Sequence, residues 1–185
     1  MPTPGRRYGG VAQALHWVIA ALVVTQFALA YSAAGLPLGI ERLILMARHK
    51  SVGMTILMLS IVRLAWRIWN PPPPLPDGIR AIEQRLARYS HRAFYVLLFA
   101  MPLSGWLMSS AKNYSVSWFN LLTWPDLIGK SETAFQWLRG LHDTMSVVLL
   151  VLASLHVLAA FRHQFWLKDG VLLRMLPFGK PWRLP

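Results

Sequence analysis

Cysteine is absent from this chain of 185 residues, and charged residues make up only 14% of it. Without cysteine there is no disulfide framework, no iron–sulfur cluster and no thiol chemistry, so any redox activity needs a cofactor that is held without a covalent bond to sulfur. Hydrophobic residues make up 55% of the chain and the mean hydropathy is +0.41. A soluble domain of this length is far less apolar, so the composition predicts a polytopic membrane protein.

Acidic residues are also scarce, with 7 Asp and Glu against 19 Lys and Arg, which gives a formal net charge of +12. The basic residues lie in short segments between apolar runs, which favours membrane topology and anionic lipid over nucleic acid as their partners. With the N-terminus inside the cell, 13 of the 19 lie on inner segments and 6 on outer ones. The positive-inside rule therefore predicts that both termini are cytoplasmic.

Long apolar runs are plentiful, and each is long enough to cross a hydrocarbon core of about 30 Å. They lie at about 11–34, 49–70, 91–110 and 141–163. We expect one all-α transmembrane domain over residues 1–185, an up-down four-helix bundle. Short interfacial helices are expected beside it, including an amphipathic stretch at 79–90. Four prolines, Pro71 to Pro74, end the second segment, and residues 111–139 form a loop rich in interfacial aromatic residues.

The first apolar segment has a rival interpretation as a cleaved export signal, because it follows two arginines and contains Ala-Leu-Ala at 28–30. A signal core is usually about 7–15 residues long. This segment is longer, and it contains His16 and Trp17. We therefore expect it to be a membrane helix.

Histidines occur in all four apolar segments. His142 and His156 are fourteen residues apart on the fourth, which places them near one face and about 21 Å apart along the axis. A single histidine at membrane depth is more often a packing residue than a ligand, but His16 and His49 supply one more on each of two further segments. Because successive helices run in opposite directions, we expect His49 and His142 at one depth, toward the outside. His16 and His156 are expected together at a second depth, toward the inside. Iron in a flat macrocycle uses one imidazole from each of two helices.

Small side chains next to these histidines leave room for a broad flat ring; Gly53, for example, lies one turn after His49. Two alternatives to a bound ring stay open. Small residues also allow close helix packing in lipid. Buried imidazoles would equally serve a haem-free transporter that uses them as a metal or proton relay.

Taken together, the motifs resemble the bacterial cytochrome b561 family, four-helix di-haem membrane proteins related to the b-type subunit of nickel-iron hydrogenases. The resemblance covers nearly the whole chain. It is carried by His16-Trp17, His49-x-Ser51-x-Gly53, Val62-Arg63-Leu64, the proline run, Pro102 with Gly105, His142 with His156, and Trp166-x-Lys168-Asp169.

The resemblance implies that His16, His49, His142 and His156 are the axial ligands of two non-covalent b haems. It implies electron transfer between a periplasmic donor and membrane quinone. Some members resemble superoxide oxidases, which pass an electron from superoxide to ubiquinone. The relationship to hydrogenases implies an alternative, a membrane subunit that accepts electrons from a periplasmic dehydrogenase or hydrogenase.

Further polar residues lie where they would serve such cofactors. The inner haem propionates or lipid phosphates are the expected partners of Arg63, Arg67 and Arg162, and an outer propionate is the expected partner of Arg48, Lys50 and Ser51. Arg48 and Lys50 would also steer an anion toward the outer pair. His91 and His163 stay open between an interfacial position and a role with quinone, protons or a propionate.

Overall fold

The computed structural model describes residues 7–74 and 79–177, so parts of the predicted domain lie outside the described residues. It contains four long helices, α1 (Gly10–Ala34), α2 (Ile40–Trp69), α3 (Ala81–Ala111) and α4 (Glu132–Arg162). All 4 are long and apolar enough to cross a membrane. The predicted all-α membrane bundle is confirmed, while the cytoplasmic placement of both termini stays a prediction.

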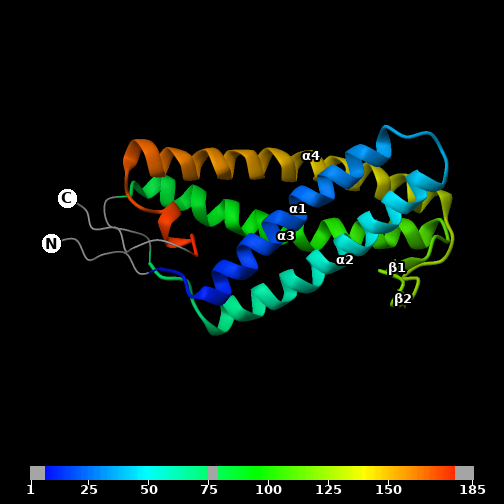
Figure 1. Ribbon diagram of the computed structural model, residues 1–185, viewed down its shortest axis with the longest axis horizontal. Helices are drawn as coiled ribbons and strands as arrows, with labels where there is room; N and C mark the ends of the chain where they lie inside the picture. Colours follow the sequence, from blue (N-terminus) through cyan, green and yellow to red (C-terminus); the bar gives the residue numbers. More distant parts are fainter. Residues whose placement is uncertain (1–6, 75–78, 178–185) are drawn as a thin grey trace.

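Alternating helix directions give the bundle two distinct ends (Figure 1). At one end, which we call the terminal end, α1 and α3 begin and α2 and α4 end. The opposite end carries two short antiparallel strands, β1 (Val116–Trp118) and β2 (Leu122–Trp124), and we call it the hairpin end. If both termini are cytoplasmic, the hairpin end faces the periplasm.

The second helix begins earlier than predicted. Residues 40–48 were expected in a loop, but they form the first turns of α2, with Glu41 favourably placed in its first turn. Only 35–39, which contain Pro37 and Gly39, separate α1 from α2. His49 therefore lies well inside α2 instead of at its start.

The third helix also begins earlier than predicted, at Ala81. The amphipathic stretch 79–90 was expected to be a separate interfacial helix, yet from Ala81 on it continues without a break into the apolar part of α3. The reason is visible in the sequence, because neither glycine nor proline occurs between 81 and 101. Pro102 lies inside α3 without ending it.

The fourth helix begins at Glu132 instead of about 141, because Ser131 caps it by accepting a hydrogen bond from the Ala134 amide at 3.2 Å. The β1–β2 hairpin was not predicted at all. Its strands are three residues each, too short to give a readable alternation, and Phe119 and Asn120 at the turn have positive φ.

The hairpin packs against the side of α2 and α3. Ser51 is the main anchor, since its hydroxyl accepts a hydrogen bond from the Phe119 amide and lies 3.0 Å from the Ser117 carbonyl. Trp118 Nε1 donates to Thr55 Oγ1 at 3.0 Å. Next to these contacts, Val116 joins a small apolar cluster with two residues of α2 and with aromatic neighbours: Met54, Leu57, Phe99, Trp106, Trp118 and Trp124.

At the terminal end, α4 continues into a π-helical turn, η1 (His163–Leu167), and a 3₁₀ turn, η2 (Leu172–Arg174). Arg174 is buried, and its guanidinium donates to the carbonyls of Pro73 and Pro74. Its own carbonyl accepts hydrogen bonds from the Tyr8 amide and the Gln13 side chain. Burial lowers the pKa of Arg174. The C-terminal segment is thus tied to the start of α1 and to the proline run.

Candidate functional site

The histidines come together in two pairs, one toward each end of the bundle. Toward the hairpin end, the rings of His49 from α2 and His142 from α4 have their centroids 6.4 Å apart. Toward the terminal end, the rings of His16 from α1 and His156 from α4 are 6.3 Å apart. We call these the outer pair and the inner pair. The structure therefore brings together the residues that depth alone had paired.

The His142 ring is oriented by Ser104 of α3. Ser104 Oγ donates to the Met101 carbonyl at 2.8 Å and lies 2.9 Å from His142 Nδ1; in this arrangement the ring nitrogen donates to the hydroxyl. With the proton on Nδ1, the other ring nitrogen, Nε2, keeps its lone pair free for a metal. Gly105 makes room for this ring, because a Cβ there would lie 3.3 Å from His142 Cε1.

At the outer pair, α1 contacts the backbone of His49. The Gln26 side chain donates to the His49 carbonyl at 3.0 Å, and a Cβ on Gly53 would lie 3.1 Å from that same amide nitrogen. Gly53 thus lets α1 approach α2 closely beside His49. The Nδ1 of His49 is buried and has no hydrogen-bond partner among the described residues. A buried polar atom without a partner is costly, so a hydrogen-bond partner for this nitrogen would stabilise the ring.

The inner pair lies in a more crowded aromatic setting. His91 from α3 packs against His156 with centroids 5.7 Å apart, and Phe94, one turn along α3, lies 5.2 Å away on the same ring. Trp17 lies edge-on to His16 at 5.2 Å. His91 is half-buried beside the inner pair, so the structure favours a role there over a surface position.

The spacing of both pairs fits one iron between the two rings. Two imidazoles that bind a metal from opposite sides, through metal–nitrogen bonds of about 2 Å, have ring centroids roughly 6.3 Å apart. Among the described residues, no group of three or more His, Cys, Asp or Glu could hold a metal ion by itself, and each histidine pair offers two ligands. A porphyrin supplies four nitrogen ligands to its iron, so each histidine pair would complete the coordination of one such iron.

The three arginines expected near the inner pair are in different situations. Arg63 lies close enough to act electrostatically on His16, on His156 and on His91. Arg67 lies over the Tyr95 ring, 5.7 Å from its centroid. Arg162 makes an ion pair with Glu83 at 2.9 Å. Arg63 is therefore the best placed of the three for a propionate of a ring held by the inner pair.

The residues expected around the outer pair are engaged mainly by the hairpin. Lys50 Nζ donates to the Ser115 carbonyl at 3.2 Å and lies 5.6 Å from the centre of the Tyr114 ring. Ser51 holds the turn of the hairpin through the Phe119 amide. Arg48 is exposed at the helix surface. Neither Arg48 nor Lys50 has a carboxylate partner among the ion pairs of the described residues.

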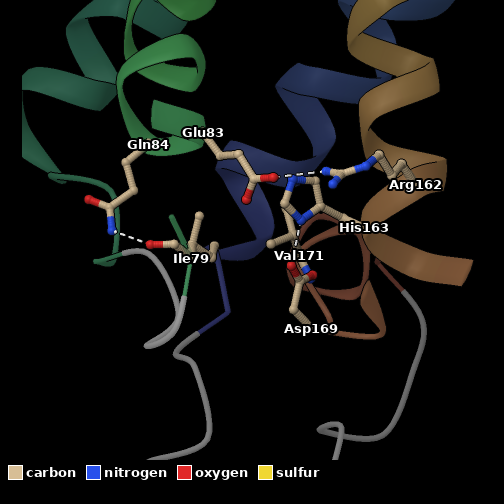
Figure 2. Close-up of polar contacts among 7 residues, drawn as sticks. All are labelled: Ile79, Glu83, Gln84, Arg162, His163, Asp169 and Val171. Carbon is tan, nitrogen blue, oxygen red and sulfur yellow. Dashed lines mark hydrogen bonds and ion pairs between the residues drawn. The ribbon is translucent and has the colours of Figure 1, made fainter. Parts of the chain in front are cut away.

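His163 lies in a polar cluster at the terminal end (Figure 2). Its Nδ1 is hydrogen-bonded to Asp169, and the Glu83–Arg162 ion pair lies on the other side of the ring. The side chain of His163 is only 14% exposed, so its polar neighbours cover most of it. Sequence reasoning missed Ser104, Gln26 and Glu83 as partners of these sites, since nothing in a sequence tells which polar residue of one helix faces a histidine of another.

Comparison with known proteins finds relatives that cover almost the whole chain. The chain is 33% identical over 181 residues to cytochrome b561 homolog 2 of Escherichia coli, covering 92% of this chain and 91% of that protein. It is 26% identical over 172 residues to the probable superoxide oxidase CybB of Yersinia pestis, covering 93% and 97%. The family described as prokaryotic cytochrome b561 matches residues 7–178. With four membrane helices and paired histidines, this chain belongs to the prokaryotic cytochrome b561 family, multi-pass inner-membrane electron-transfer proteins that use b-type haem.

Proposed function

We propose that this chain is a di-haem electron carrier that passes electrons across the membrane from the outer pair to the inner pair. The observation that carries the proposal is the spacing of the two histidine pairs, 6.4 and 6.3 Å between ring centroids. His49 and His142 would hold the outer haem, and His16 and His156 the inner haem. A b-type haem supplies one-electron transfer at its iron.

The protein residues set the surroundings of each electron site. At the outer pair, Ser104 fixes the tautomer of His142, and Gly105 keeps space for its ring. At the inner pair, the positive charge of Arg63 favours an added electron and the binding of a propionate. On α4, the fourteen residues from His142 to His156 correspond to about 21 Å, so two sites are needed to carry an electron across the core.

The donor we propose is superoxide, and the acceptor is ubiquinone. Two superoxide ions each lose one electron and leave as dioxygen, while one ubiquinone gains both electrons and two protons to become ubiquinol. The name of the Yersinia pestis relative supports superoxide as the donor. So do Arg48 and Lys50, two cations beside His49 at the end of the bundle that we propose faces the periplasm.

The first test is the optical spectrum of the purified chain, expressed with adequate haem supply. We expect a low-spin b-type spectrum and two haems per chain by the pyridine haemochrome assay. A colourless preparation would overturn the proposal and favour the haem-free transporter in its place.

The second test is stopped-flow reduction of the oxidised haems by superoxide, followed by their reoxidation on adding ubiquinone. Fast reduction by superoxide is the expected result. A slow reaction with superoxide, together with co-purification of a large periplasmic dehydrogenase or hydrogenase, would replace superoxide with that partner as the donor. The di-haem carrier would then remain.

A further inference from the structure

The β1–β2 hairpin lies at a depth that the membrane occupies. Figure 1 shows it to the side of α2 and α3 instead of beyond the ends of the helices. A hydrocarbon core of about 30 Å takes up about 20 residues of a helix, and α2 has 30. The first such run in α2 would end at residue 59 and the last would begin at residue 50, so residues 50–59 lie within the core wherever it falls. The hairpin contacts α2 inside this range, at Ser51, Met54, Thr55 and Leu57.

The hairpin carries no charged side chain, since no Asp, Glu, Lys or Arg occurs between Lys112 and Asp126. A short two-stranded sheet in water has unpaired edges, which proteins commonly protect with charged residues, above all lysine. At membrane depth the same residues would be costly. Lys50 of α2, at the limit of the range, directs its amine to the Ser115 carbonyl, 3.2 Å away. The absence of charge fits a hairpin that borders lipid better than one that lies in water.

The apolar side chains at the turn of the hairpin are exposed. Phe119, Leu121 and Leu122, which we call the hairpin tip, are 50%, 77% and 52% exposed. Asn120 lies between the first two and is uncharged. Three large apolar side chains gathered at one turn favour a partner that removes them from water. At the level of residues 50–59 of α2, acyl chains of lipid are that partner.

Backbone groups at the turn have protein partners, as a non-helical segment at membrane depth requires. The strands β1 and β2 pair with each other. The Leu121 amide donates to the Trp118 carbonyl at 2.9 Å, and the Phe119 amide donates to Ser51 Oγ at 3.0 Å. These polar groups are thus directed to other protein groups, which leaves the apolar side chains of the hairpin tip to contact lipid.

We propose that the hairpin tip is inserted among the acyl chains of the lipid leaflet at the hairpin end. The lipid-facing surface of the helices then continues onto the hairpin. The hairpin is held on one side by Ser51 and Thr55 of α2 and on the other by lipid. The inference does not depend on haem, because it concerns only where the hairpin lies in the membrane.

A protein partner is the competing occupant, because exposed apolar patches also mark protein interfaces. The two occupants differ in what surrounds the hairpin tip when the chain is alone in a bilayer. A surface reserved for a soluble partner would then be in contact with water. A tip inserted among acyl chains would be shielded from water and would touch lipid.

The natural absence of cysteine makes a test specific, because an introduced thiol is the only one in the chain. Leu121→Cys in the full chain, reconstituted in phosphatidylcholine nanodiscs, is treated with a charged maleimide that does not enter lipid. Leu127→Cys is the matched control, since Leu127 is 43% exposed and its amide donates to Ser110 near the end of α3. We expect the thiol at position 121 to react at least about tenfold more slowly, because the thiolate is the reactive form and hydrocarbon disfavours it.

A second readout reports contact with lipid directly. The same two variants are labelled with an uncharged fluorophore, and quenching by phosphatidylcholine that carries a nitroxide on its acyl chain is compared with quenching by aqueous iodide. The label at position 121 should be quenched more strongly by the lipid nitroxide, and the label at position 127 by iodide. The ratio of the two cancels any quenching by a bound haem. Leu122→Cys repeats both measurements, so that a folding defect in one variant leaves the inference open to refutation.

Slow reaction together with strong quenching by the lipid nitroxide at positions 121 and 122 is the result that supports insertion. Reaction as fast as in the control, with equal quenching by iodide, would overturn the inference, because the hairpin tip would then lie in water and a protein partner would be left as its occupant. Slow reaction without quenching by the lipid nitroxide would also overturn it, since the hairpin tip would then be covered by protein.

Discussion

The two histidine pairs have nearly the same spacing, 6.4 and 6.3 Å, but they lie in different surroundings. The outer pair is bordered by hydrogen bonds, one between Ser104 and the ring of His142 and one from Gln26 to the backbone carbonyl of His49. The inner pair is bordered by a third histidine, His91, and by the charge of Arg63.

This difference suggests a division of labour. Fixed hydrogen bonds hold a ring in one tautomer and orientation, which suits a site that only receives and passes on electrons. Nearby cations and titratable groups respond to added charge, which suits a site where electron arrival is coupled to protons. The comparison leads to the following predictions, which run from the largest expected effect to the smallest.

Removing one ligand from each pair tests whether the two sites are separate. In His156→Ala we expect the inner haem to be lost and the outer one kept, and in His142→Ala the reverse. Each variant should contain one haem per chain instead of two by pyridine haemochrome, with different residual spectra. Loss of both haems from a chain that still has its helical circular dichroism would contradict the idea of two independent sites.

Gly105 is expected to affect the outer pair alone. A larger side chain there must displace the His142 ring, because even a Cβ would lie 3.3 Å from its Cε1. Gly105→Val should therefore reduce the outer haem content by at least half and leave the inner haem in place. Gly140→Ala is the control, since a Cβ there would meet nothing within 4 Å. Equal loss of both haems would show that Gly105 serves helix packing in general.

The sequence predicted the bundle well because its strongest signal, long apolar runs, depends only on local composition. It also predicted which histidines meet, since depth along alternating helices follows from the chain order. Helix starts at 40, 81 and 132 were predicted several residues late, because each of these first stretches contains charged residues, which are equally typical of loops.

The contacts that orient the pairs could not be predicted in the same way. Ser104, Gln26 and Glu83 are ordinary polar residues on helices, and their partners depend on how each helix is rotated about its axis. The hairpin was missed because its role depends on Ser51, a single buried hydroxyl that faces it. The ligand roles of the four histidines remain a prediction that the haem spectrum and the ligand variants test.

Ser51 tests whether the hairpin belongs to the outer site. Ser51→Ala leaves the Phe119 amide and the Ser117 carbonyl without this partner, which we expect to cost about 1–3 kcal/mol of stability. Thermal unfolding in detergent measures the loss, and limited proteolysis at the hairpin shows whether it has come away. Spectral changes should be confined to the outer haem. If the inner haem changes equally, the hairpin supports the bundle as a whole.

The smallest effect is expected from the cations at the hairpin end, and it separates steering from simple net charge. Charges that steer an anion raise its association rate in a way that added salt suppresses. Arg48 and Lys50 border His49 and have no carboxylate partner in the described part of the chain, whereas Lys112 is paired with Glu132 at 2.7 Å.

Arg48→Gln and Lys50→Gln should therefore each slow haem reduction by superoxide a few-fold at low salt, with the difference vanishing as ionic strength rises. Lys112→Gln removes the same formal charge from a residue that does not border His49, so it should slow the reaction less. Stopped-flow rates measured across a range of salt concentrations distinguish local steering from an effect of net charge. Equal slowing in all three variants would mean that only net charge counts. A rate indifferent to salt in every variant would reject steering while leaving the electron transfer itself intact.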